Sequence, residues 1–404
     1  MHAVQKSEIR DSIAKVFEHV QGQHNHDYTC LYNAYTEAAN GKTMCEADYI
    51  GHPLHADSGG LQIVTRGHAI TSDVKKGVYK SQALHSGIAM CFDEIPVTTS
   101  AGGSKIGDTT SRFFDRSLVS EKAKHTAENI VEQANYFASK DTKAKIMIIV
   151  QGYDYDSYQA WMNEMVNTIP KELYPYICGL AIAGSSSGSG QLEDVERAWT
   201  FARLECPDEW KNRLHLLGVG ACRRMAPFTA LGPNLYNNCT ISYDSTTHSN
   251  NVSMRTFKSE DISGRFTNLM YGFRTDQIMK VYDIVKNTFP FIDIDYAMYE
   301  DMLNFNRESF IDKYTEDKLP LFHQGMIATC LSSVLKTADT INQMTDPKKY
   351  KKFCATDKKT LPLMNLVEVK DENSYNSYMR DYGKFLKSVR IAEVNDKSSL
   401  EAFF

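Results

Sequence analysis

Carboxylates, an amide and glycines recur in this 404-residue sequence at the ends of short apolar segments. A polar residue in such a place is, taken alone, more often a turn or helix-capping residue than a catalytic one. Carboxylates accept hydrogen bonds, an amide donates and accepts them, and glycines let a flat ligand approach the backbone. Together these residues predict a site for a flat, neutral ligand rich in hydrogen-bond donors, such as a guanine-like base. They are Asp57, Asp93, Gln151, Gly184, Gly218 and Asp244.

The preceding apolar segments would bring these residues together if they formed one parallel sheet. Helical patterns lie between most of the segments, for example over 120–140 and 155–169. Alternating strands and helices predict parallel pairing, and seven units favour a (β/α)8 TIM barrel over a six-stranded open sheet. Active sites of such barrels lie where the strands end. The seven expected strands lie within 28–35, 55–64, 88–97, 144–153, 179–188, 214–221 and 239–245.

The rest of the chain is expected to complete the barrel and to extend it. An amphipathic helix is predicted over 4–20, and the apolar run TFPFIDIDYAM over 288–298 is a candidate eighth strand. We expect the α/β barrel to occupy 1–300 and a mostly helical C-terminal extension to occupy 301–404, with a helix or helix pair over 319–344. The sequence has no GxGxxG motif at a first strand–helix turn, which counts against a dinucleotide-binding fold.

Composition narrows the function classes further. Hydrophobic residues make up 42% and charged residues 24% of the chain, as in soluble globular proteins. The net charge of −5 argues against a protein that is basic throughout, although the lysines of 348–359 form a local basic run. Nine cysteines without a CxxC motif indicate a reducing compartment. We find no secretory signal and no membrane-spanning run, so we expect a cytoplasmic protein, in the host cytoplasm if it is viral.

Six segments, in order, resemble motifs of the tRNA-guanine transglycosylase superfamily. DSGGLQ (57–62) is similar to its Asp-Ser-Gly-Gly-Phe-Gln motif, and FDEIP (92–96) to its Asp-Glu-Cys-x-Pro motif. Gln151-Gly152 is similar to Gln-Gly-Gly, and GLAIAGSSSG (179–188) to Gly-Tyr-Ala-x-Gly-Gly. LLGVG (216–220) is similar to Leu-Met-Gly-Val-Gly, and YDS (243–245) to Phe-Asp-Cys. The closest branch is the phage and bacterial DNA-guanine transglycosylases, which insert 7-deazaguanine bases into DNA.

The resemblance implies a role for each matched residue. Asp244 would be the nucleophile that attacks the sugar C1′ and forms a covalent glycosyl-enzyme, and Asp57 would be the general acid/base. Two displacements would retain the configuration at C1′. The implied substrates are guanine in DNA and a 7-deazaguanine base, for which we expect 7-cyano-7-deazaguanine (preQ0). The base-binding set would be Ser58, Gly59, Gly60, Asp93, Gln151, Gly184, Ser185, Leu217 and Gly218.

Departures from the family pattern indicate which nucleic acid is the substrate. Leu61 and Leu217 replace a Phe and a Met beside the base, Ile95 replaces a Cys, and STTHSNN (245–251) replaces an arginine-bearing run. The family's zinc motif is absent. Because the spacing of His323, Cys330 and Cys354 fits no standard zinc site, we expect no metal; if zinc were bound, these three would be its ligands.

These losses remove elements associated with tRNA and favour DNA, from which the target guanine must be flipped out. Arg223, Arg224 and Arg255 are the candidate phosphate contacts, with Lys258 and the 348–359 lysines after them. Arg223 and Arg224 are equally consistent with ordinary surface residues at the start of a helix. The alternatives are a divergent tRNA-guanine transglycosylase and an inactive barrel that acts as a binding subunit. The sequence leaves the oligomeric state open.

Overall fold

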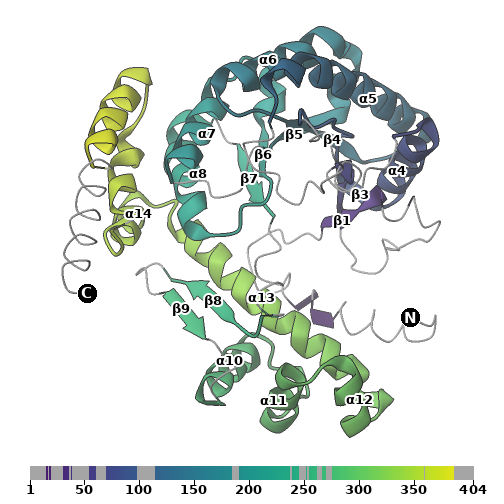
Figure 1. Cartoon of the computed structure of the whole chain (residues 1–404), viewed down its shortest axis with the longest axis vertical. Coiled ribbons are helices and arrows are strands. Elements are labelled where there is room, and N and C mark those ends of the chain that lie inside the picture. The colour runs from purple at the N-terminus through teal and green to yellow at the C-terminus, as the bar shows by residue number, and fades with distance from the viewer. Residues whose placement is uncertain are drawn as a thin grey trace, which may run out of the picture.

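The structure is a computed structural model in which seven strands form one parallel sheet in sequence order (Figure 1). They are β1 (Leu31–Asn33), β2 (Leu54–Asp57), β3 (Ser86–Met90), β4 (Lys145–Val150), β5 (Ile177–Ile182), β6 (Arg213–Leu216) and β7 (Thr240–Tyr243). Each strand overlaps one of the seven predicted segments. The structure describes residues 15–16, 18–19, 31–35, 38, 54–60, 70–97, 114–183, 191–236, 239–244, 252, 254–261, 266–269, 275–358 and 360–385.

The central strands are apolar because both of their faces are covered. In β4, every residue from Ile146 to Val150 is buried. Parallel strands that are covered on both sides require such continuous apolar runs rather than an alternating pattern.

The sheet is strongly curled. β2 and β6 are four positions apart in the strand order, which in a flat sheet corresponds to about 19 Å. The rings of His55 on β2 and His215 on β6 nevertheless lie with their centroids 6.3 Å apart. Side chains of distant strands therefore meet inside the curl.

Helices follow the strands and ring the outside of the sheet (Figure 1). Local sequence sets their limits: α6 begins at a capping box between Asp154 and Ser157, and α5 ends at Asp141, which adopts a left-handed conformation. On α5, Ala123, Ala127, Ile130, Ala134 and Phe137 are buried at helical spacing. The helices are α4 (Ser72–His85), α5 (Val119–Lys140), α6 (Tyr155–Thr168), α7 (Gln191–Arg203) and α8 (Cys222–Leu235).

A second part of the molecule combines a two-stranded antiparallel sheet with helices. Its strands are β8 (Phe257–Glu260) and β9 (Phe266–Leu269). The long helix α13 (Leu319–Gln343) runs past β8 and reaches α8, one of the helices around the parallel sheet (Figure 1). α13 confirms the helix predicted over 319–344. The helices of this part are α10 (Thr275–Thr288), α11 (Tyr296–Asn304), α12 (Arg307–Tyr314) and α13 (Leu319–Gln343), after which comes α14 (Pro347–Cys354).

The prediction of an eighth strand over 288–298 is wrong. Thr288 ends α10, Tyr296 begins α11, and the residues between them form a turn and an irregular connection. The apolar side chains Phe289, Ile292 and Ile294 are buried in a cluster with residues of α10, α11 and α13. Burial of a connection between helices, not pairing with a sheet, therefore explains this apolar run.

The chain near the predicted boundary belongs to one packed unit. Residue 300 lies inside α11, and a single buried cluster extends from Phe257 to Leu335. Val16, in the segment predicted as an N-terminal helix, belongs to the same cluster, and the four described residues of that segment are helical.

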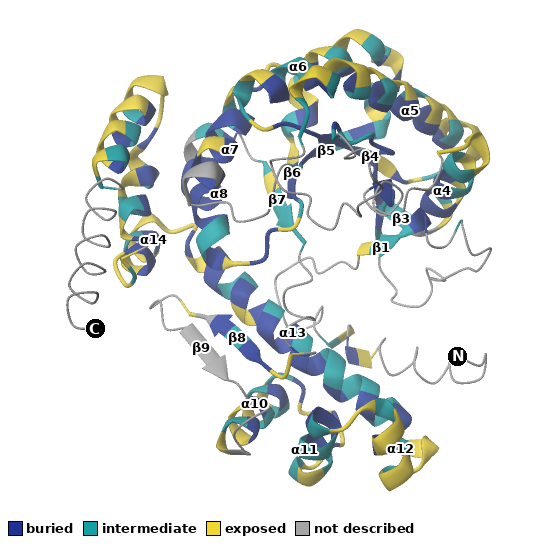
Figure 2. Ribbon diagram, in the orientation of Figure 1, coloured by how far each residue is buried: buried dark blue, intermediate teal, exposed yellow. Residues whose placement is uncertain are grey.

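The C-terminal residues pack against the part of the molecule that contains the parallel sheet. Tyr350 on α14 and Tyr375 belong to the same buried cluster as residues of this sheet and its helices. The rings of Tyr375 and Trp199 on α7 stack at 4.2 Å and 7°. Figure 2 shows buried inner faces and exposed outer faces on these C-terminal helices.

Within the described part of the chain, no helix is long and apolar enough to cross a membrane.

Candidate active site

The ends of the strands carry the polar residues singled out from the sequence. Asp57 is the last residue of β2, and Asp93 lies just beyond β3. Gln151 directly follows β4, and Asp244 directly follows β7. Because all four strands are parallel and the sheet is curled, these side chains lie at the same end of one curled surface.

Asp93 and Gln151 form a buried pair. Gln151 Nε2 donates to Asp93 Oδ2 at 2.7 Å, and the two residues are 7% and 4% exposed, respectively. Burial raises the pKa of Asp93 to about 7, although the hydrogen bond from Gln151 opposes the rise; the charge of Asp57 adds to it. Near neutral pH this carboxyl therefore exists in both forms, and it can accept a hydrogen bond from a ligand or donate one.

Asp57 has a pKa in the same range. Burial raises the pKa of Asp57 to about 6; the backbone N–H of Gly59 opposes the rise and the charge of Asp244 adds to it. Asn33 on β1 donates from Nδ2 to Asp57 Oδ2 at 3.3 Å. A carboxyl with this pKa gives up and takes back a proton close to neutral pH, as general acid/base catalysis requires.

Asp244 has the opposite character. Burial alone would raise its pKa, but hydrogen bonds from His215 and from the backbone N–H of Gly218 bring the pKa below the ordinary value. His215 Nε2 lies 3.1 Å from Asp244 Oδ1, and Gly218 N donates to the same oxygen at 3.0 Å. Asp244 is therefore held as a carboxylate at neutral pH.

His215 was not singled out from the sequence. It is 2% exposed, and its Nδ1 lies 2.9 Å from Ser242 Oγ on β7. Because an ionised carboxylate only accepts hydrogen bonds, we assign the proton to Nε2, which donates to Asp244, and the hydroxyl of Ser242 donates to Nδ1. Its position in the run LHLL (214–217) could have indicated it, because every second residue of a strand in a curled sheet faces the interior.

His55 is a second histidine that sequence reasoning missed. Burial, followed by electrostatic interactions with His215 and Arg213, lowers the pKa of His55 to about 4. The ring is therefore neutral at pH 7 and adds no charge beside the carboxylates.

The glycines of the DSGG segment allow close packing against Tyr35 and Asp93. Gly59 has a φ of +80°, and a Cβ there would lie 2.3 Å from Tyr35 Cβ. A Cβ on Gly60 would lie 2.8 Å from Asp93 Oδ1. Ser58 is fully buried, and its Oγ accepts a hydrogen bond from Gly60 N at 3.3 Å.

The remaining predicted base-binding residues divide into two groups. Leu217 and Gly218 follow β6, and Leu217 is partly buried against the core around the parallel sheet. Gly184, Ser185 and the expected stacking position Leu61 lie outside the described residues.

The candidate phosphate contacts all have partners within the chain. Arg223 pairs with Asp357 at 2.5 Å, and Arg224 pairs with buried Asp194 at 3.0 Å. Arg255 Nη2 donates to the carbonyl of Asn304 at 3.1 Å. Their roles toward a polynucleotide stay predictions. Among the other candidates, Lys258 lies on β8, and Lys351 of the basic run pairs with Glu368 at 2.6 Å.

The three residues considered as zinc ligands lie in the C-terminal part. His323 and Cys330 are on α13, and Cys354 ends α14. Burial raises the pKa of the Cys330 thiol to about 11 and that of Cys354 to about 12, so both are protonated at neutral pH. Within the described ranges, no three His, Cys, Asp or Glu side chains are placed to hold a metal ion.

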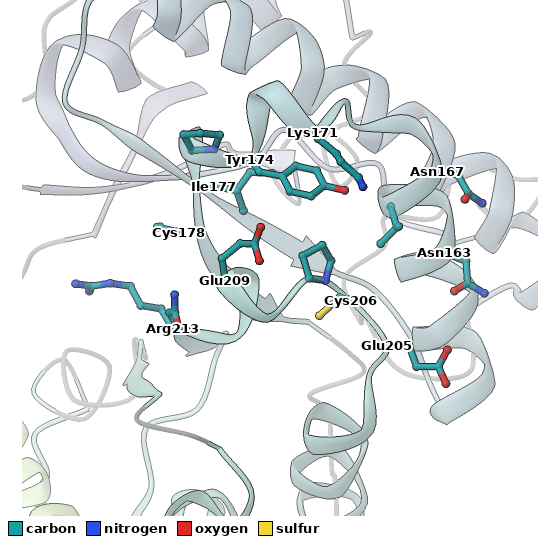
Figure 3. Close-up of a pocket in the computed structure, with 14 residues that line it drawn as sticks. Asn163, Asn167, Lys171, Tyr174, Ile177, Cys178, Glu205, Cys206, Glu209 and Arg213 are labelled. Carbon is teal, nitrogen blue, oxygen red and sulfur yellow. The ribbon is translucent and has the colours of Figure 1, made fainter.

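A surface hollow of about 1210 Å³ lies at the other end of the sheet (Figure 3). Ile177 and Arg213, which begin β5 and β6, line it together with Lys171, Tyr174 and Glu209. The carboxylates lie where strands end, so this hollow is separate from them. In parallel α/β sheets, ligands bind outside the carboxyl ends of the strands, which is the opposite end from this hollow.

Comparison of the chain with protein-family models and with curated proteins finds no match. Evidence about function comes from the site itself. It contains one carboxylate held in its ionised form and two carboxyls that exchange protons near neutral pH, a division of roles typical of acid/base and nucleophilic catalysis.

Proposed function

We propose that this protein is a DNA-guanine transglycosylase that replaces guanine in DNA with 7-cyano-7-deazaguanine through a covalent glycosyl-aspartate. The observation that carries the proposal is the opposite tuning of Asp244 and Asp57. The pKa of Asp244 is lowered while that of Asp57 is raised to about 6. Nucleophilic displacement of a base needs one carboxylate on the sugar and one group that moves protons on the base.

In the first half of the exchange, Asp244 forms a bond to C1′ and the bond between C1′ and N9 of guanine breaks. The electron pair of that bond goes to guanine, and protonated Asp57 supplies the proton that neutralises the departing base. Asp93 and Gln151 accept from and donate to the edge of the base. The products are free guanine and a glycosyl ester on Asp244.

In the second half, the incoming base reverses these roles. Its N9 loses a proton to ionised Asp57 and attacks C1′, and the ester bond to Asp244 breaks to restore the carboxylate. Two inversions return the original configuration at the sugar. No oxidant, metal or nucleotide cofactor is needed to balance either half.

The fold proposed for this chemistry is a (β/α)8-type barrel with a helical C-terminal extension. Seven consecutive parallel strands and the contact between His55 and His215 inside the curl support it. A guanine within a duplex reaches the mouth only after it is flipped out.

The test is base exchange with radiolabelled guanine, offered duplex DNA and tRNA side by side. We expect label in DNA, and a covalent protein–DNA adduct on a denaturing gel that an Asp244→Ala variant does not form. Labelling of tRNA alone would contradict the proposal and indicate a divergent tRNA-guanine transglycosylase. Binding of a base or polynucleotide without exchange would favour an inactive binding subunit.

A further inference from the structure

Gly218, whose N–H contacts the nucleophile, is also held through its carbonyl, which belongs to the next peptide group. Gly218 has a φ of +70°, and its N–H donates to Asp244 Oδ1 at 3.0 Å. The carbonyl of Gly218 accepts a hydrogen bond from Arg224 Nη1 at 3.3 Å. A glycine in this left-handed region is easily reoriented, because it lacks the side chain that would restrict its dihedral angles. Holding the carbonyl of Gly218 limits the dihedral angles of this residue and, through them, the direction of its N–H.

Arg224 is fixed by a buried carboxylate. Its Nε and Nη2 donate to the two oxygens of Asp194 at 3.0 and 3.2 Å, a bidentate geometry. Asp194 is 1% exposed and also accepts from Arg197 Nη1 at 3.1 Å. The pair joins α7, which carries Asp194, to the start of α8, which carries Arg224. Two barrel helices thus anchor the guanidinium that contacts Gly218.

We propose that Arg224 is a positioning residue, which, anchored by Asp194, aims the Gly218 N–H at the nucleophile Asp244. The assignment rests on the proposed function for the role of Asp244, and it revises the expectation that Arg224 contacts phosphate. A guanidinium that already satisfies a buried carboxylate and a backbone carbonyl has few donors left for a polynucleotide.

The other groups around Asp244 determine how much the site changes when Arg224 no longer holds Gly218. His215 faces it from β6, Ser242 supports His215 from β7, and the carboxyl of Asp57 faces it from β2. His215 remains in place when Arg224 is changed, so Asp244 keeps one of its two hydrogen bonds. The expected result is a partial loss, not an abolished site.

The experiment compares Arg224→Lys with the wild-type protein and with a control, Arg203→Lys. Lysine keeps the charge but cannot form the bidentate pair. Arg203 pairs with Glu372 near the end of α7, away from the Gly218 loop. The first readout is the pKa of Asp244, measured by ¹³C NMR on aspartate-labelled protein. The second is exchange, and the third is the salt dependence of DNA affinity.

We expect Arg224→Lys to raise the pKa of Asp244 by about 1 pH unit, which corresponds to loss of one hydrogen bond to a charged group. Turnover should fall about 10-fold at unchanged KM for the base, and the slope of DNA affinity against salt should not change. The control should match the wild type in all three readouts.

An unchanged pKa of Asp244 overturns the proposal. If the salt slope falls by about 1 at the same time, Arg224 is a phosphate contact instead. A raised pKa in a protein whose wild type exchanges no base would support the positioning role and refute the proposed function. If Arg224→Lys does not fold, Arg224→Gln removes the guanidinium while Asp194 stays paired with Arg197, and the same readouts apply.

Discussion

Asp57 has to act as an acid in one half of the exchange and as a base in the other, so the two halves should titrate in opposite directions. Guanine release needs the protonated carboxyl, which is lost as pH rises through about 6. Attack by the incoming base needs the carboxylate, which is lost as pH falls through about 6. We expect the first rate to decline and the second to increase between pH 5 and pH 8.

The raised pKa sets the size of the effect. At pH 7, an aspartate with its ordinary pKa of 3.8 is protonated in roughly one molecule in 1,600, but one with a pKa of about 6 in roughly one in 11. The site therefore holds about 150-fold more of the acid form that guanine release consumes. In Asp57→Asn both rates should fall by ~10²–10⁴ and lose their pH dependence near 6, because the amide transfers no proton.

Rapid-quench single turnovers separate the two halves. Release is followed with DNA that carries labelled guanine and no incoming base. Return is followed by adding the base to the preformed covalent adduct. If both rates change in the same direction with pH, or if Asp57→Asn keeps the wild-type profile, the acid/base assignment is refuted. Asp93, with its pKa of about 7, is then the next carboxyl to test.

Four further predictions use single changes. Asp244→Ala should abolish exchange while the fold remains, and more than about a hundredth of wild-type turnover, a barrier change under ~2.7 kcal/mol, would disprove the nucleophile assignment. Gly60→Ala should raise KM for the base, because its Cβ would lie 2.8 Å from Asp93 Oδ1. Gly383→Ala, with nothing within 4 Å of its Cβ, is the matched control, and equal KM values would contradict the crowding argument. Asp57→Asn should gain stability over wild type as pH rises between about 4 and 6, because the folded-state pKa exceeds the ordinary value of 3.8. Urea unfolding at pH 4.5 and 7.5 measures this, and a gain that shrinks with pH would be the wrong sign. Exchange should survive dialysis against a chelator, and elemental analysis that finds one tightly held zinc per chain, lost together with the fold, would refute the metal-free reading.

The parallel sheet could be predicted because its strands are short, buried and separated by helices. The same criterion wrongly predicted a strand over 288–298. A short apolar segment is consistent with a buried strand, but also with any other buried segment. Phe289, Ile292 and Ile294 are buried by α10, α11 and α13, contacts that no local pattern encodes. The β8–β9 hairpin was missed as well.

The carboxylates of the site could be predicted from the sequence, but the residues that set their pKa values and positions could not. Asp57 and Asp244 follow apolar runs and can be found by position. His215 lies inside such a run, and only the curl of the sheet turns it toward Asp244. The pairing of Arg224 with Asp194 joins two helices, so the sequence alone left Arg224 looking like a free surface cation.

The stack between Trp199 and Tyr375 has a consequence for the protein as it is being made. The ribosome delivers Trp199 and the rest of α7 long before Tyr375, and at ~5–20 residues per second the interval is on the order of ten seconds or more. During that time Trp199 lacks the ring that covers it in the folded protein, although the strands β1 to β7 all become available to pair well before Tyr375 does. The nascent sheet therefore passes through a stage in which Trp199 on α7 is exposed, and the segment that contains Tyr375 later covers it.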